Sequence, residues 1–179
     1  MHKILISAAT LVSLAACSSL DQTIGPSLSR GGKSEVPRPL KGQCDTEVTI
    51  LSIGPDGRLD LSIEYTCRIS HLGLTHNTVV QSVIPAGPPT GTLLPVLVNN
   101  TGAYVAANGD RLDSSFTGTG VTNLADFTAV FEGTETFLGG TGRFANASGT
   151  AHIQGTAALD PATGTGTAHF TLSEGTITY

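Results

Sequence analysis

The alternation of apolar and polar side chains is most regular between residues 58 and 69. Every second side chain in this segment belongs to one set: Leu59, Leu61, Ile63, Tyr65, Cys67 and Ile69. The positions between them are polar or charged. A period of two is typical of a β-strand with one buried face and one solvated face.

The segment just upstream shows the same alternation and predicts the partner strand of a hairpin. Cys44, Val48 and Ile50 share one phase. Between the two segments lies Gly54-Pro55-Asp56-Gly57, which suits a type I turn because Pro stands second and Gly stands fourth. We therefore expect an antiparallel pair with its turn centred between residues 55 and 56.

That turn fixes which residues lie opposite each other. The expected pairs are Ile50 with Leu61, Val48 with Ile63, and Cys44 with Cys67. A shift by one residue would turn one strand's apolar set outward. The apolar pattern and the two cysteines select the same register independently.

The rest of the chain repeats this pattern between short turns rich in Gly, Pro, Asn and Asp. Further alternating segments occupy residues 74–84, 93–98, 104–116, 127–137, 149–157 and 168–172. Asn108-Gly109 predicts a hairpin turn with both residues at positive φ, and Pro95 predicts an edge strand or a bulge. No segment shows a helical period.

These segments predict an all-β domain of about eight antiparallel strands. Consecutive strands joined by short turns favour an up-and-down barrel, because closure removes the exposed edges. A two-sheet β-sandwich is the alternative. The lumen of an eight-stranded barrel is either filled by side chains or holds one small ligand.

Composition and charge exclude some classes of protein. Gly occurs 22 times and aromatic residues make up only 5% of the chain, a balance that disfavours helices. From residue 41 onward, five Lys and Arg stand against twelve Asp and Glu. Nucleic acid is not an expected partner, because phosphate backbones require a basic surface.

The first seventeen residues have the form of an export signal. A short positive start precedes an apolar run over residues 4–16, too short for the roughly 20 residues of a membrane-spanning helix. Leu14-Ala15-Ala16-Cys17 resembles the lipobox of bacterial lipoproteins. We therefore expect a signal peptide over residues 1–16 and a lipid anchor on Cys17; an ordinary signal peptide is the alternative. Ser18 after the cysteine implies, by the same resemblance, the outer membrane of the cell envelope.

Export also bears on the domain boundaries and on the other two cysteines. Residues 17–40 contain scattered Ser, Gly and Pro and predict a flexible tether, so the barrel domain is expected over residues 41–179. Exported proteins meet oxidising conditions, which predicts a Cys44–Cys67 disulfide. The pair lacks the Cys-x-x-Cys spacing of a redox-active site and has no nearby His for zinc.

One glycine-rich segment carries a family resemblance. Residues 139–149, Gly-Gly-Thr-Gly-Arg-Phe-Ala-Asn-Ala-Ser-Gly, resemble a stretch of dirigent and allene oxide cyclase-like β-barrels and of uncharacterised bacterial exported proteins with that fold. Residues 70–73 and 106–110 resemble the same bacterial group. The resemblance implies a barrel. The glycines themselves predict a turn, with Phe144 lying inside. Plant members guide a reactive oxylipin or phenoxy-radical intermediate, but no motif transfers their catalytic residues.

Candidate chemistry rests on polar residues that share a phase with apolar ones. Glu135, Tyr65 and His76 are the candidates for the lumen face. A carboxylate among phenylalanines would have a raised pKa and could act as a general acid or base. The alternatives are a solvated Glu135, Tyr65 as a core residue and a solvated His76. No catalytic, metal-binding or cofactor motif is present, so no metal or cofactor is predicted.

Three functions remain open at this point. The favoured one is a non-enzymatic envelope lipoprotein whose barrel binds a small apolar molecule or a neighbouring protein. The others are a cyclase-like or isomerase-like barrel enzyme and a structural or adhesive surface module. A lumen with room for a ligand would favour the first two, whereas a lumen plugged by phenylalanines would favour the third. A carboxylate or His inside the cavity would favour catalysis.

Overall fold

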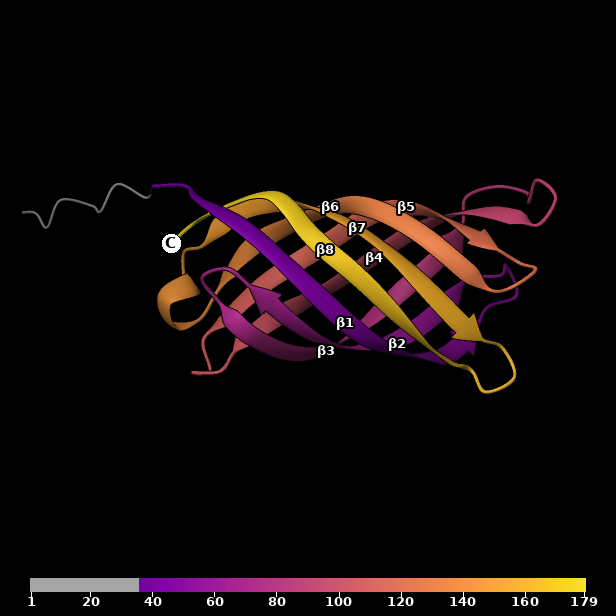
Figure 1. The fold of residues 1–179 in the computed structure, drawn as a ribbon, viewed down its shortest axis with the longest axis horizontal. Helices are drawn as coiled ribbons and strands as arrows, with labels where there is room; N and C mark the ends of the chain where they lie inside the picture. Colours follow the sequence, from indigo (N-terminus) through magenta and orange to yellow (C-terminus); the bar gives the residue numbers. More distant parts are fainter. Residues whose placement is uncertain (1–35) are drawn as a thin grey trace, which may run out of the picture. The chain divides into compact units, whose positions relative to one another are not determined.

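The computed structural model describes residues 36–179 and shows a closed barrel of eight antiparallel strands (Figure 1). Each strand pairs with the next one along the chain, and the last pairs with the first. The strands are β1 (Arg38–Ile53), β2 (Leu59–Ile69), β3 (Gly73–Pro85), β4 (Leu93–Ala106), β5 (Arg111–Asn123), β6 (Thr128–Gly140), β7 (Ser148–Asp160) and β8 (Thr165–Thr178). A short 3-10 helix, η1 (Gly142–Phe144), lies between β6 and β7. The predicted up-and-down barrel is confirmed, and the sandwich alternative is wrong.

The barrel begins earlier than the sequence predicts. β1 starts at Arg38, ahead of the expected boundary at residue 41, and Leu40 is buried in the core. The end of the predicted tether therefore belongs to the barrel. The predicted signal peptide, the predicted lipid anchor at Cys17 and the tether as far as residue 35 lie outside the described residues.

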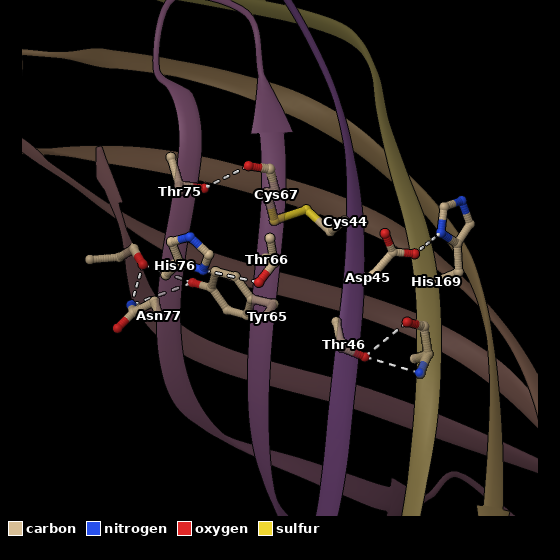
Figure 2. Close-up of a disulfide and its surroundings, with 12 residues drawn as sticks. Cys44, Asp45, Thr46, Tyr65, Thr66, Cys67, Thr75, His76, Asn77 and His169 are labelled. Carbon is tan, nitrogen blue, oxygen red and sulfur yellow. Dashed lines mark hydrogen bonds and ion pairs between the residues drawn. A yellow bond between two sulfur atoms is a disulfide. The ribbon is translucent and has the colours of Figure 1, made fainter. Parts of the chain in front are cut away.

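The β1–β2 hairpin has the predicted register. Ile50 lies opposite Leu61 and Val48 opposite Ile63. Cys44 lies opposite Cys67 with the two Cα atoms 4.1 Å apart, and a disulfide joins them (Figure 2). Both cysteines point into the barrel and are fully buried. The disulfide therefore clamps two neighbouring strands from inside the core.

The turn that ends this hairpin differs in detail from the expectation. Gly57 has a φ of +81°, and the Gly54 amide donates to the carbonyl of Arg58 at 2.8 Å. The turn is thus centred on Asp56. A bulge between Ile50 and Ser52 restores the predicted register further along the strands. The apolar pattern decides the register here, and the turn accommodates it.

Two other local predictions need correction. The β4–β5 turn has positive φ at Gly109 but not at Asn108, and the Ala106 amide donates to the carbonyl of Asp110 at 2.9 Å. It is therefore a longer turn that needs only one left-handed residue. The edge or bulge expected at Pro95 is also wrong, because β4 pairs with β3 and β5 in a closed barrel without a register shift.

The interior of the barrel has a closed half and an open half. In the closed half, side chains from several strands and from η1 are buried together: Leu40, Leu112, Phe137, Phe144, Ala147, Leu172 and Ile177. The β2–β3, β4–β5 and β6–β7 connections lie at this end (Figure 1). The other four connections lie at the opposite end, which is the mouth of the open half.

The glycine-rich segment lies at the closed end of the barrel, and Phe144 lies inside, as the sequence predicts. Phe144 is fully buried, and its ring centroid lies 5.0 Å from that of Tyr179. The Thr141 amide donates to the carbonyl of Arg111 at 2.8 Å, and the Thr141 hydroxyl accepts from the Arg111 amide at 3.0 Å. A Cβ on Gly140 would lie 1.9 Å from that same carbonyl oxygen. Only glycine therefore allows β6 to approach β5 here.

Candidate functional site: a buried carboxylate in an apolar cavity

The open half of the barrel contains a cavity of about 120 Å³. Its wall is mainly aliphatic and aromatic and includes Val48, Leu61, Ile63, Val79, Val96, Val98, Phe116, Phe131, Ile153, Leu159 and Phe170. Phe127, in the β5–β6 turn, lines it at the mouth and is 38% exposed. The cavity therefore runs from the mouth of the barrel towards its middle.

The room exists because several inward positions carry small side chains. Ala129 on β6 and Ala157 on β7 lie opposite each other in the wall. Deeper inside, Gly118 and Gly133 also form a pair, and a Cβ on either would come within 3 Å of the Phe116 ring. That ring therefore lies against bare backbone. The sequence alternation supplies the apolar wall, and the small residues leave the space within it.

Glu135 is the carboxylate inside this cavity. It lies on β6 in phase with Phe131 and Phe137, opposite Phe116 on β5, and only 3% of its surface is exposed. Burial raises its pKa to about 7, while hydrogen bonds from Ser114 and Tyr104 act in the opposite direction. The group thus titrates near neutral pH, the range in which a carboxyl can act as an acid or a base.

Two tyrosines lie beside the carboxylate. The ring centroids of Tyr65 and Tyr104 are 5.5 Å apart. The Tyr65 hydroxyl donates to the carbonyl of Ala103 at 2.8 Å, and the Asn77 amide nitrogen also donates to that carbonyl (Figure 2). Burial raises the pKa of both tyrosine hydroxyls, and the charge of Glu135 adds to the increase. Both tyrosines are therefore neutral in the range where Glu135 titrates.

The Tyr65–Asn77 contact fills an interruption in the barrel wall. The β3–β4 ladder pairs His76 with Val105 and resumes only at Gln81 with Asn100. Side-chain donors from Tyr65 and Asn77 satisfy the Ala103 carbonyl within this interval. Gly102 lies there too, and a Cβ on it would meet the Val79 side chain at 2.2 Å. Side-chain hydrogen bonds thus replace backbone ones beside the cavity.

The structure brings two of the three predicted site residues together. Glu135 and Tyr65 both line the cavity, so the alternative that places Glu135 in water is wrong. Tyr65 also belongs to the buried core, as its alternative states. His76 does not join them: it is exposed on the outer face, where its Nδ1 lies 3.0 Å from the Thr66 hydroxyl (Figure 2). The prediction of a lumenal His76 is therefore wrong, because its phase was taken from Leu74 and Val80, which are themselves exposed.

Sequence reasoning missed the two hydroxyls that act on Glu135. Ser114 and Tyr104 lie on β5 and β4, and both are buried. Ser114 shares a phase with Phe116, which signals an inward position. Their approach to Glu135 depends on how three strands are staggered around the barrel, and alternation along one strand does not encode that.

The remaining charged groups lie outside the cavity. Arg111 pairs with Asp113 at 2.7 Å, and the His169 imidazole lies 2.9 Å from a carboxylate oxygen of Asp45. Over residues 36–179, no three His, Cys, Asp or Glu side chains are grouped so that they could hold a metal ion. No helix in that range is long and apolar enough to cross a membrane.

Comparison with known proteins adds no assignment. The chain matches no model of a protein family, no curated protein and no solved structure.

Proposed function

We propose that the chain is a lipid-anchored protein of the bacterial envelope, held at the outer membrane, whose barrel binds one small apolar ligand. The observation that carries the proposal is the apolar cavity of about 120 Å³ in the open half. An apolar cavity of about 150 Å³ accepts benzene. The ligand is therefore roughly the size of one six-membered ring.

The contrast between the two halves supports binding over a purely structural or adhesive role. Protein interiors are normally packed with few voids, and the closed half, with Phe137 and Phe144 buried, follows that rule. A structural module has no need to leave the other half unfilled. A small molecule fits the site better than a neighbouring protein does, because the lining faces inward from the barrel wall.

Native mass spectrometry of the protein from its own cells tests this proposal. We expect a non-covalent adduct of small mass. Ala157→Phe, which fills the cavity, should abolish the adduct, whereas Ala158→Phe on the exposed face of the same strand should retain it. A barrel that is empty in repeated preparations would favour the structural role instead.

The proposed lipid anchoring to the membrane is tested separately. Cys17→Ala removes the thiol that would carry the lipid. We expect the variant to lose its acyl chains and to leave the membrane fraction, because multiple acyl chains make anchoring nearly permanent. An acylated, membrane-bound Cys17→Ala variant would contradict the lipoprotein assignment and leave the cavity proposal intact.

Catalysis is the second candidate, and Glu135 is the observation that favours it. A carboxyl with a pKa of about 7 inside an apolar cavity is suited to proton transfer in an isomerase-like or cyclase-like barrel. The test is to isolate the co-purifying molecule and incubate it with excess wild-type protein. A chemical change that Glu135→Gln abolishes would support an enzyme, and recovery of the unchanged molecule would support a binding protein.

A further inference from the structure

The cavity has a feature that narrows the class of its ligand. Among residues 36–179, Glu135 is the only carboxylate in its lining, and none of the Lys, Arg or His residues of this range lines it. Buried charges in proteins are normally paired. The cation that would pair with Glu135 is thus not supplied by the cavity wall.

Two hydroxyl groups beside Glu135 favour its ionised form, although burial outweighs them and raises its pKa to about 7. Ser114 and Tyr104 provide hydroxyl donors, and both hydrogen bonds favour the ionised form. An ionised carboxylate offers about four acceptor positions. Two hydroxyls leave room for a further donor, and Glu135 lines the cavity in which a ligand would lie.

Charged residues at the mouth of the barrel also favour a cationic ligand. Asp56, Asp126 and Asp160 lie in the turns or strand ends at this end of the barrel. The only Lys or Arg there, within residues 36–179, is Arg58, whose guanidinium pairs with Asp60 at 2.8 Å. The other cations of this part of the chain lie towards the closed end: Arg38, Lys41, Arg68, Arg111 and Arg143. Aspartates therefore outnumber the single arginine at this opening, and an excess of negative charge attracts cationic ligands.

We infer that the ligand is a small apolar amine, whose ammonium group pairs with Glu135 at the inner end of the cavity while its hydrocarbon body lies against the apolar wall. This inference rests on the proposed function, that the cavity binds a ligand. The rings of Tyr65, Tyr104 and Phe116 line the same site, and aromatic faces attract cations. A carboxylic acid of the same size is disfavoured, because its charge would repel that of Glu135 in a region of low dielectric.

The competing ligand is a neutral molecule that accepts a hydrogen bond from protonated Glu135. The two ligands have opposite pH dependences. An amine binds better as the pH rises through the pKa of Glu135 at about 7, whereas a neutral acceptor binds better below it. The titratable groups that face Glu135 are Tyr104 and Tyr65, and both keep their protons over this range because their pKa values are raised. Glu135 alone therefore decides whether binding becomes stronger or weaker as the pH rises.

Calorimetric titration of the full chain with three matched probes tests the inference. The probes are benzylamine, benzyl alcohol and benzoate, which share a ring and differ in charge. At about pH 8 we expect benzylamine to bind about tenfold or more tightly than benzyl alcohol, since charge-assisted hydrogen bonds are roughly twice as strong as neutral ones. Benzoate should bind most weakly. Glu135→Gln should remove the preference for the amine and leave binding of the alcohol.

Each remaining outcome is decisive. If benzyl alcohol or benzoate binds as tightly as benzylamine, the inference of an amine ligand is wrong, while the proposal that the cavity binds a ligand is supported. If no probe binds the wild type, both proposals fail. Ala157→Phe should block every probe, and Ala158→Phe should block none. Should Glu135→Gln fail to fold, the pH dependence of the wild-type protein provides the test. If its affinity for benzylamine does not fall when the pH is lowered from about 8 to about 5.5, the inference is wrong.

Discussion

The closed and open halves of the barrel are built from the same eight strands but treat their interiors differently. In the closed half, Phe144 and Ile177 are fully buried and a disulfide joins β1 to β2. In the open half, Phe131 and Leu159 are only partly buried around a cavity. Alternation along a strand decides which side chains face inward. Side-chain volume then decides whether the inside is filled.

The difference assigns stability mainly to one half and ligand recognition mainly to the other. Well-packed apolar side chains stabilise by burial and by dispersion contacts. A cavity wall forfeits part of this stabilisation, and Glu135 adds the desolvation of a carboxylate. A protein accepts such costs where a ligand binds. Substitutions in the closed half should therefore mainly change the free energy of unfolding, whereas substitutions in the open half should mainly change ligand affinity.

The largest effect is expected in the closed half. Phe144→Ala should lower the free energy of unfolding by about 3–5 kcal/mol, because a fully buried ring is lost and the sealed end cannot collapse onto the gap. Phe131→Ala, in the cavity wall, should cost clearly less, since its ring is partly exposed before the change. Urea unfolding of both variants measures the difference. Equal losses would show that the two halves do not differ in packing.

The disulfide is expected to rank next. Replacing Cys44 and Cys67 together with alanine should lower the free energy of unfolding by about 3 kcal/mol, because the closed loop no longer restricts the unfolded chain. Denaturant unfolding of the variant, compared with wild type with and without reductant, provides the measurement. The reduced wild type serves as the control and should resemble the variant. An unchanged midpoint would mean that the clamp contributes nothing.

Glu135 should give the open half a pH dependence. Its pKa lies at about 7 in the folded protein and near 4.5 when unfolded, so the unfolded state ionises first. The contribution of Glu135 to the free energy of unfolding is fully present below pH 4.5. It is lost as the pH rises towards 7, which lowers the free energy of unfolding by up to about 3 kcal/mol. Glu135→Gln should remove that loss. The difference in unfolding free energy between the two proteins, followed from acid to about pH 8, isolates the group; a constant difference would contradict it.

The sequence predicts the fold well because its strongest signals are local. Alternation over β2, paired cysteines and short turns suffice for the strand order and for the β1–β2 register. The same alternation identifies Glu135 as inward-facing. The alternation wrongly predicts that His76 faces inward, because the apolar residues Leu74 and Val80, which share its phase, are themselves exposed. Ser114 and Tyr104 escape detection because their meeting with Glu135 depends on the stagger of strands in three dimensions.

The smallest effect on stability, and the sharpest separation of the halves, is expected at Phe127. This residue has a φ of +55° at the mouth, a left-handed conformation that L residues other than Asn and Asp rarely adopt. Phe127→Gly relieves that strain but removes a ring from the cavity wall. We expect unfolding free energy to change by less than about 1 kcal/mol, while the affinity for benzylamine falls several-fold. Leu124→Gly, which alters an exposed side chain of the same turn outside the cavity lining, is the control and should leave affinity unchanged. A substantial loss of stability with unchanged affinity would instead place Phe127 among the residues that hold the barrel together.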